Sequence, residues 1–245
     1  MIFTGRLAAQ DAPLGEIPAG KGSLSASGKF QPVETPGVSE PDPMARLAEL
    51  GIKLDEETVK IGLVEIDRKT HSVSFPATVQ MTEGIIEYAV VHANGKIHES
   101  LFVTDALPRD IHIACLLAGC QNKENKSSTP VLIEVSWKAN GPPRRERLED
   151  LVVFAKERPQ GERSGRLASG SWDYTGSLID AGGFAATREG SVVSVISDPA
   201  ALVVNPRPGR EDDTLHVPNV ALLPGLGFPV RITLRLASAP TNPAP

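Results

Sequence analysis

The residues best suited to chemistry gather in one stretch, GKIHESLFVTDALPRDIHIACLLAG, at positions 95–119. It holds His98 and His112 together with Glu99 and Cys115. Two imidazoles with a carboxylate or a thiolate form a donor set that suits zinc, copper or iron. We therefore predict, as one use of this stretch, a transition-metal site built from His98, Glu99 and His112.

A structural role competes with the metal site for the same histidines. A histidine beside a strand or a helix end commonly bonds a backbone carbonyl or joins a buried network. We favour this role and expect at least one of the two rings to be buried and bonded to protein. Cys115 falls on an apolar helical face, which predicts a core residue. Cys120 follows Gly119 and is predicted to be exposed, so that a bridge to Cys115 would require the helix end to unwind.

Nucleophilic catalysis and the common cofactors find little support. Ser100 and His98 share one face of a predicted strand, which does not by itself bring a nucleophile to a base, and no GxSxG turn occurs. The phosphate, dinucleotide, HExxH and calcium-loop patterns are also missing. An iron–sulfur cluster needs about four cysteine ligands, and the chain has 2. We predict no catalytic residue and no iron–sulfur cluster, and the cofactor, if any, is a transition metal ion.

Oxygen-bearing side chains in a loop-rich segment offer a second kind of site. Asp198, Asp212 and Asp213, with Asn205 and Asn219 nearby, carry the ligand atoms that calcium prefers. Asp and Asn before proline or in pairs more often form turns by accepting bonds from nearby amides. The three aspartates are kept as ligand-binding candidates, with turn formation as the competing interpretation.

Two aromatic residues complete the candidate set. Trp172 and Tyr174 point to the same side of a predicted strand, with Asp173 opposite. Such a pair serves either as a platform for a sugar or peptide or as part of the core, and the core is the commoner place.

Short strands must position most of these residues. The two arms of GIIEYAVVHANGKIHESLFV flank Asn94-Gly95, a dipeptide typical of type I′ turns, so we predict a hairpin over residues 85–103. Pro108 and the helix-period face ending at Gly119 predict a helix over 108–118. A further hairpin is predicted from the runs 59–67 and 71–77.

The remaining pattern also favours strands. Strands are predicted at 131–137 and within 172–180, 184–197 and 229–237, and the charged first half of 144–154 predicts a helix. The fold class expected is α+β: mainly antiparallel β-strands with one packed helix after a central β-hairpin, in a single domain.

Composition bounds the domain and its partners. Residues 1–43 are rich in proline and small residues and predict a disordered arm, followed by a domain at 44–237 that opens on a two-turn helix, and by a tail at 238–245. A net charge of -5 gives no footprint for nucleic acid. No apolar run is long enough to span a membrane, and no apolar stretch of a signal peptide is visible near the start. The expected partner is a protein or a small ligand.

Several separated segments resemble one family. IEY at 86–88, the stretch 95–119, WDYTGS at 172–177, EGSVVSVISDPAALVVNP at 189–206 and DDTLHVPN at 212–219 occur in that order. Together they resemble the YdjY-like family of bacterial exported or lipid-anchored proteins over roughly residues 58–236. The resemblance implies export, to the periplasm or outside the cell, but no established activity. We expect a non-catalytic extracytoplasmic binding or assembly module, with a metal-binding or redox accessory protein using His98 and His112 as the alternative.

Overall fold

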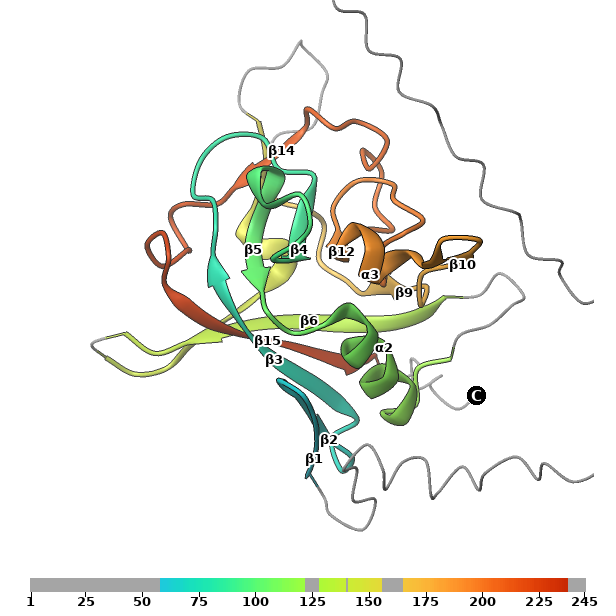
Figure 1. The fold of residues 1–245 in the computed structure, drawn as a ribbon. Helices are drawn as coiled ribbons and strands as arrows, with labels where there is room; N and C mark the ends of the chain where they lie inside the picture. The colour runs from blue at the N-terminus through green and yellow to red at the C-terminus, as the bar shows by residue number, and fades with distance from the viewer. Residues whose placement is uncertain (1–57, 122–127, 140, 156–164, 238–245) are drawn as a thin grey trace, which may run out of the picture. The chain divides into compact units, whose positions relative to one another are not determined.

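A computed structural model describes residues 58–121, 128–139, 141–155 and 165–237. Its helices are α2 (Pro108–Leu117) and α3 (Ala185–Glu189), with the 3-10 turns η1 (Ile97–Glu99) and η2 (Leu148–Leu151). Its strands are β1 (Thr58–Ile61), β2 (Val64–Asp67), β3 (Ser72–Val79), β4 (Tyr88–His92), β5 (Ser100–Thr104), β6 (Thr129–Trp137), β7 (Arg144–Arg147), β8 (Val152–Phe154), β9 (Trp172–Tyr174), β10 (Ile179–Asp180), β11 (Gly183–Phe184), β12 (Ser191–Ser194), β13 (Val203–Val204), β14 (His216–Pro218) and β15 (Pro229–Leu236). Figure 1 shows their arrangement.

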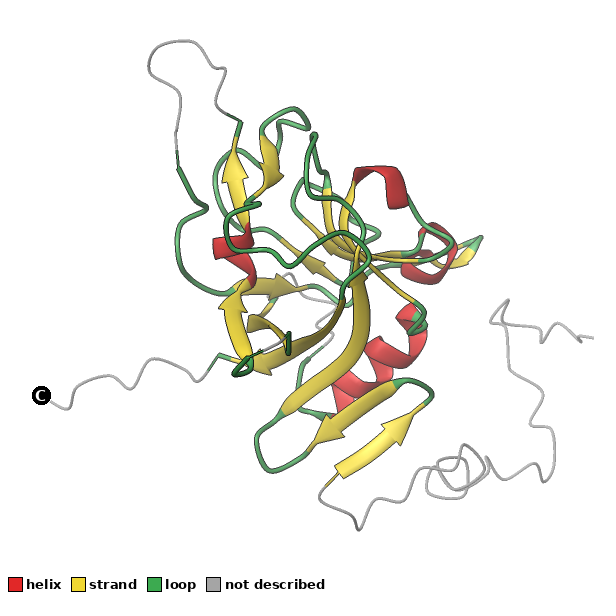
Figure 2. Cartoon of the chain, turned by 90° about the vertical axis from the view of Figure 1, so that its left-hand side faces the viewer, coloured by secondary structure: helices red, strands yellow, loops and turns green. Residues whose placement is uncertain are grey.

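The main feature of the described residues is a closed β-barrel of 8 strands. Its strands follow the order β3, β15, β6, β9, β13, β12, β4 and β5. The barrel closes because β5 returns to β3, where Thr78 faces Val103 and Val79 faces Phe102. Strands β1 and β2 extend the sheet beyond β3, and β7 pairs with β6. Figure 2 shows how strongly the long strands curve.

The prediction of an α+β fold is therefore wrong. Helix makes up only 13% of the structure, and the sheet is not a meander with one packed helix but a ring. The error has a physical cause: period-two patterns identify strands, but they do not say which strands pair across long stretches of sequence. The closing pairs here join β3 to β5 and to β15, which lies at the other end of the domain.

Alternation along the long strands builds the core. In β6, Val131, Ile133, Val135 and Trp137 are buried while the residues between them are not. In β15 the alternate residues Val230, Ile232 and Leu234 are buried in the same way. Successive side chains of a strand point to opposite faces, so one apolar face is removed from water and the other stays polar.

The predicted helix is confirmed as α2. Pro108 opens it, as proline can at a position whose N–H has no helical partner, and the predicted apolar face formed by Ile111, Ala114, Cys115 and Ala118 is buried. The helix packs against β2 and β3 (Figure 1). Its N-cap is Leu107, which makes no side-chain cap hydrogen bond.

The hairpin predicted over residues 85–103 is wrong. Strands β4 and β5 are neighbours but run parallel, with Tyr88 facing Ser100 and Val90 facing Phe102. The Asn94-Gly95 dipeptide led to the wrong prediction because Gly95 does not adopt the left-handed conformation of a type I′ turn. A Cβ on Gly95 would lie only 3.0 Å from the carbonyl oxygen of Glu189, so the position needs glycine for close packing.

Other predictions were partly right. The hairpin between the runs 59–67 and 71–77 is confirmed as β2 with β3, but the first run is itself split into β1 and β2 at Gly62, which has φ +56°. The strand at 131–137 is confirmed as β6, and β15 confirms the strand at 229–237. The helix predicted in 144–154 is wrong, since β7, η2 and β8 occupy it, and α3 replaces the start of the strand predicted in 184–197.

Several predictions fall on residues that the structure does not describe. These are the arm at 1–43, the short helix after it and the tail at 238–245. Within the described ranges, no helix is long and apolar enough to cross a membrane.

Candidate functional site

Two short crossover connections meet at the most chemically varied pocket of the barrel. Parallel strands β4 and β5 are joined by residues 93–99, and parallel strands β12 and β13 by residues 195–202. Both connections line one pocket of about 310 Å³. We call it the crossover pocket, and its lining is Tyr88, Lys96, Leu178, Asp180, Ala185, Arg188, Glu189, Ser191, Asp198, Pro199 and Ala200.

The backbone of Glu87 ties the two connections together. Its N–H donates to the carbonyl oxygen of Glu99 at 2.9 Å, and its own carbonyl accepts from the N–H of Val195 at 2.9 Å. One residue at the start of β4 therefore fixes both loops relative to the barrel. The lining residues sit on a backbone scaffold rather than on independent loops.

Lys96 lies over Tyr88 in the centre of the pocket. Its Nζ is 5.3 Å from the centroid of the Tyr88 ring, a cation–π geometry. Burial by itself would lower the pKa of Lys96, but the Tyr88 oxygen and the carboxylates of Glu87 and Glu99 outweigh burial and raise it. Burial also raises the pKa of Tyr88, helped by the charge of Asp198. At neutral pH the pocket therefore presents an ammonium above a neutral phenol.

Two carboxyl groups lie close to the Lys96 ammonium. Oε2 of Glu87 lies 3.5 Å from Lys96 Nζ and Oε2 of Glu99 lies 3.9 Å from it. Burial raises the pKa of Glu87, and the charge of Glu99 raises it further. Oε2 of Glu99 is buried and accepts no hydrogen bond from the described residues. Glu87 therefore holds on to a proton more readily than an isolated carboxyl would.

Another part of the lining is an ion-pair cluster on α3 and the β10–β11 hairpin. The Arg188 guanidinium binds Asp180 through two hydrogen bonds of 2.7 and 3.0 Å, and its Nε donates to Glu189 at 2.9 Å. These bonds raise the pKa of Arg188 and lower that of Asp180, so both stay charged. This part of the lining thus carries fixed charges of both signs.

Two glycines let the Lys96 loop dock against the end of α3. Gly190 ends the helix in the left-handed region at φ +71°. A Cβ on Gly190 would lie 2.7 Å from both Cα and N of Gly95. The Asn94 amide also donates to the carbonyl of Thr187 at 3.2 Å. This contact between the two backbones sets the position of Lys96.

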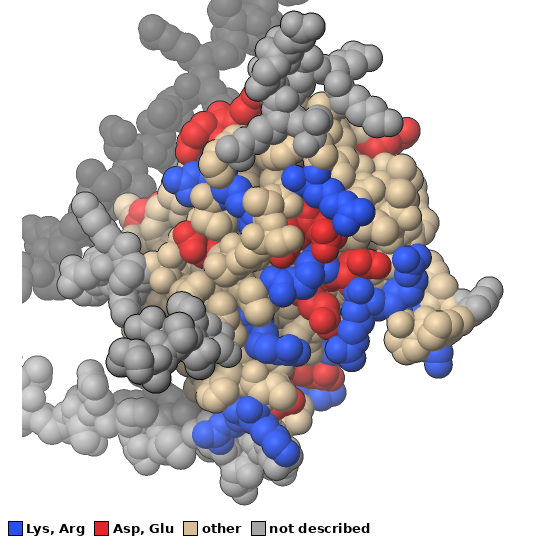
Figure 3. Space-filling model, turned by 180° about the vertical axis from the view of Figure 1, so that it is seen from behind, with Lys and Arg blue, Asp and Glu red and all other residues tan. Residues whose placement is uncertain are grey.

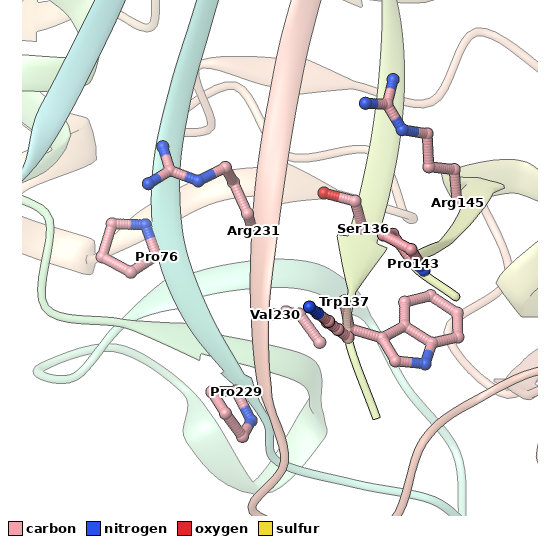
Figure 4. A pocket seen from close by; sticks show the side chains of 9 residues that line it. Pro76, Ser136, Trp137, Pro143, Arg145, Pro229, Val230 and Arg231 are labelled. Carbon is pink, nitrogen blue, oxygen red and sulfur yellow. The ribbon is translucent and has the colours of Figure 1, made fainter. Parts of the chain in front are cut away.

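A larger hollow of about 380 Å³ lies on another part of the sheet (Figure 4). It is lined by Pro76, Ser136, Trp137, Lys138, Pro143, Arg145, Pro229, Val230 and Arg231. Its two arginines are already engaged, Arg145 with Glu134 at 3.3 Å and Arg231 with Glu65 at 2.7 Å. Figure 4 shows both guanidinium groups extending away from the Trp137 ring. The hollow is shallow and lacks converging polar groups, so we rank the crossover pocket above it despite its smaller volume.

Figure 3 shows the molecule from behind, where Lys and Arg side chains alternate with Asp and Glu. Alternating signs of this kind give a solvated surface with no single-sign field to attract a polyelectrolyte.

The structure does not assemble the predicted metal site. His98 lies in η1 rather than on the strand, its side chain is 75% exposed, and its Nε2 is 3.5 Å from Glu99 Oε1. His112 follows β5 in the chain and lies on α2, where its ring is 5.0 Å from the Phe184 ring. Among the described residues, no three His, Cys, Asp or Glu side chains are grouped so as to hold a metal ion.

His112 meets the structural expectation in part, because its ring is bonded to protein but only half-buried. Its Nδ1 is hydrogen-bonded to the Tyr174 hydroxyl at 2.8 Å, and its ring is half-buried. Burial lowers the pKa of His112, so the ring is neutral at pH 7. The bond links α2 to β9.

Trp172 and Tyr174 both lie in the core, which confirms the core interpretation of the pair. The Trp172 indole N–H donates to the buried Glu149 carboxylate at 3.3 Å, and the Arg207 guanidinium lies 5.0 Å from its ring. Glu149 also pairs with Arg147 at 3.2 Å. The polar atoms of the aromatic pair are thus satisfied within the protein.

The three aspartates lie in two loops, which are joined by the backbone bond from the N–H of Ser197 to the carbonyl of Arg210 at 2.8 Å. Asp198 lines the crossover pocket, and its carboxylate accepts from the N–H of Ala200 at 2.8 Å. Asp212 accepts from the N–H and the hydroxyl of Thr214 at 3.0 and 2.7 Å, as expected of a turn former, and Asp213 is exposed in the same loop. Of the three, only Asp198 is among the residues that line the crossover pocket.

Sequence reasoning missed most of the pocket. Tyr88, Lys96 and Arg188 were not proposed as site residues, because nothing in their spacing marks them. The available signal was indirect: IEY, GKIHES and EGSVVSVISDP carry the resemblance described above, and these segments supply Glu87, Tyr88, Lys96 and Asp198.

The protein is a closed β-barrel, and its crossover connections line a pocket that carries paired charges. The YdjY domain family matches residues 64–235, which is most of the chain. The protein belongs to the YdjY family, as the sequence segments predict. Neither a curated protein nor a solved structure matches the chain.

Proposed function

We propose that the protein is a non-catalytic, extracytoplasmic binding module whose ligand occupies the crossover pocket. The observation that carries the proposal is the Lys96 ammonium held over Tyr88 at the meeting point of the two connections. Three of the five segments that carry the family resemblance, 86–88, 95–119 and 189–206, contribute residues to the lining of the pocket. The extracytoplasmic location rests on the export that this resemblance implies.

The charges of the pocket favour a small zwitterionic ligand. Lys96 offers positive charge to a carboxylate and Asp198 offers negative charge to an ammonium, while Arg188 is already paired with Asp180 and Glu189. Leu178, Pro199 and Ala200 supply apolar surface for the remainder of the ligand. A free amino acid or a short peptide carries both charges at the required small size, and opposite charges on both partners give specificity as well as attraction.

Binding is favoured over catalysis because the pocket holds its protons tightly. The pKa values of Lys96 and Arg188 are raised, so neither group releases a proton near neutral pH. A general acid or base works best when its pKa lies near the working pH. The pocket is therefore better suited to recognise charge than to transfer protons.

Calorimetric titration of the full chain tests the proposal, with free amino acids and dipeptides as probes. We expect at least one zwitterionic probe to bind, and its N-acetylated amide to bind about tenfold more weakly or not at all. Lys96→Met should weaken binding by about tenfold or more. Lys60→Met is the matched control, because Lys60 is an exposed lysine paired with Glu65 at 2.8 Å on β1.

Two results would contradict the proposal: no binding across the panel, or equal losses in Lys96→Met and Lys60→Met. The metal-binding alternative is tested on the same protein by elemental analysis. Stoichiometric metal that disappears in His98→Ala would favour that alternative over a binding module for zwitterions.

A further inference from the structure

Helix α2 ends in a motif that brings the two cysteines together. The N–H of Gly119 bonds the carbonyl of Leu116 at 3.0 Å, and the N–H of Cys120 bonds the carbonyl of Cys115 at 2.9 Å. With Gly119 at φ +104°, these bonds form a Schellman motif. This motif places the side chain of the residue after the glycine against the last full turn of the helix, and here those two positions are Cys120 and Cys115.

The backbone bond limits the separation of the two residues. A bond of 2.9 Å between the Cys120 nitrogen and the Cys115 oxygen, with standard covalent geometry, keeps the two Cα atoms within about 6.8 Å. Disulfides span roughly 4.4–6.8 Å between Cα atoms. The expectation that the helix end must unwind to allow a bridge is therefore wrong, because the folded helix end itself brings the pair into range.

Each cysteine changes the pKa of the other. The neighbouring Cys120 side chain, together with burial, raises the pKa of the Cys115 thiol, and the neighbouring Cys115 side chain lowers that of Cys120. Both side chains are buried, so the predicted exposure of Cys120 is wrong. Cys120 keeps 6% of its surface exposed and Cys115 keeps 1%, so a small oxidant meets Cys120 first.

We propose that Cys115 and Cys120 are a redox modification site that forms a reversible intramolecular disulfide in the folded protein. The oxidant is hydrogen peroxide, and the reductant is an external dithiol. This site is separate from the crossover pocket and does not depend on the proposed ligand.

The reaction balances in two steps. The Cys120 thiolate attacks one peroxide oxygen, the O–O bond breaks, and hydroxide leaves and takes up a proton to become water, which gives a sulfenic acid. The Cys115 sulfur then attacks the Cys120 sulfur, the S–O bond breaks, and the oxygen leaves as water with the Cys115 proton. The two sulfurs lose two electrons in total, and one peroxide becomes two waters. Thiol–disulfide exchange with an external dithiol restores both thiols.

The first test uses the full wild-type chain, which contains no other cysteine. The folded protein is treated with an equimolar amount of hydrogen peroxide, quenched, unfolded and alkylated, and the peptides are identified by mass spectrometry. We expect a monomer in which both cysteines resist alkylation and recover after dithiothreitol. Two alkylated thiols, a sulfinic acid or an intermolecular dimer as the main product would overturn the proposal.

The second test separates the folded structure from mere closeness in sequence. The disulfide is equilibrated with reduced and oxidised glutathione for the folded chain and for the chain in denaturing urea. We expect the equilibrium constant to be about tenfold or more larger in the folded chain, because the helix end holds the thiols together. An equal or smaller constant in the folded chain would mean that the native geometry opposes the bond.

The matched variants assign the roles of the two sulfurs. Cys115→Ser leaves Cys120 without its partner, and the sulfenic acid should be trapped by dimedone. Cys120→Ser leaves Cys115 buried, and its oxidation should be about tenfold slower. Equal rates of oxidation by hydrogen peroxide in the two variants would refute the assignment of Cys120 as the attacking thiolate. If either variant fails to fold, the two tests on the wild-type chain still decide whether the disulfide forms.

Discussion

The contact between Gly190 and Gly95 leads to the sharpest prediction about the pocket. In Gly190→Ala the new Cβ lies 2.7 Å from Cα and N of Gly95, about 1 Å inside normal contact, and both neighbours are backbone atoms. The left-handed backbone at φ +71° costs an alanine about 1 kcal/mol, and overpacking adds roughly 1–3 kcal/mol. We expect the free energy of unfolding to fall by about 2–4 kcal/mol.

Gly227→Ala is the matched control. Gly227 has nearly the same backbone conformation, φ +73°, but nothing lies within 4 Å of its Cβ position. Its substitution should cost only about 1 kcal/mol, the price of the backbone conformation alone. Urea unfolding followed by fluorescence of the buried tryptophans measures both variants. Equal losses in the two variants would show that the contact with Gly95 does not hold the loop in place.

Three further predictions concern buried charge and protonation. Glu149→Ala should lower the free energy of unfolding in urea by about 2–4 kcal/mol, because it leaves the Trp172 N–H and the Arg147 charge without their partner. The control Glu211→Ala breaks an exposed ion pair of the same 3.2 Å length and should lower it by under about 0.5 kcal/mol. Similar losses in the two variants would refute the role of burial. The pKa of Glu87 is raised above its ordinary 4.5 by burial and by Glu99, so the folded state binds a proton at Glu87 more tightly than the unfolded state does. The stability of the wild type therefore falls as pH rises from 4.5 through the folded-state pKa. The free energy of unfolding of Glu87→Gln, relative to that of wild type, should therefore be higher at pH 7 than at pH 4. A stability difference between the two proteins that does not change with pH would contradict this. The pKa of His112 is lowered by burial, so stability should fall as pH drops below 6.5, and NMR titration of the ring should show protonation below that of a free imidazole.

Local features of this fold follow from the sequence, and long-range ones do not. The period-two runs of β6 and β15 and the helical face of Ile111 and Cys115 were recognised because side-chain direction depends only on local geometry. The hairpin at Asn94 failed because a turn signal competes with tertiary packing. Gly95 is explained by Gly190, which is far away in the sequence, and no local rule includes that neighbour.

The candidate site was harder to predict than the fold. A metal-ligand pattern drew attention to His98 and His112, but residues close in sequence were separated by a strand. Lys96 and Asp198, far apart in sequence, line one pocket because the two crossover connections meet. Charged residues in loops look alike in a sequence, and only the pairing order of β4, β12 and their neighbours shows which of them converge.

The place of β15 in the sheet also bears on how the chain folds. This strand lies between β3 and β6 and pairs along its length with both, yet it is the last strand of the domain to be synthesised. Until residue 236 has left the ribosome, β3 and β6 each have an unpaired edge and the ring stays open. Contacts between such distant segments slow folding, because the loop between them must first be ordered. The barrel therefore cannot close until synthesis of β15 is complete.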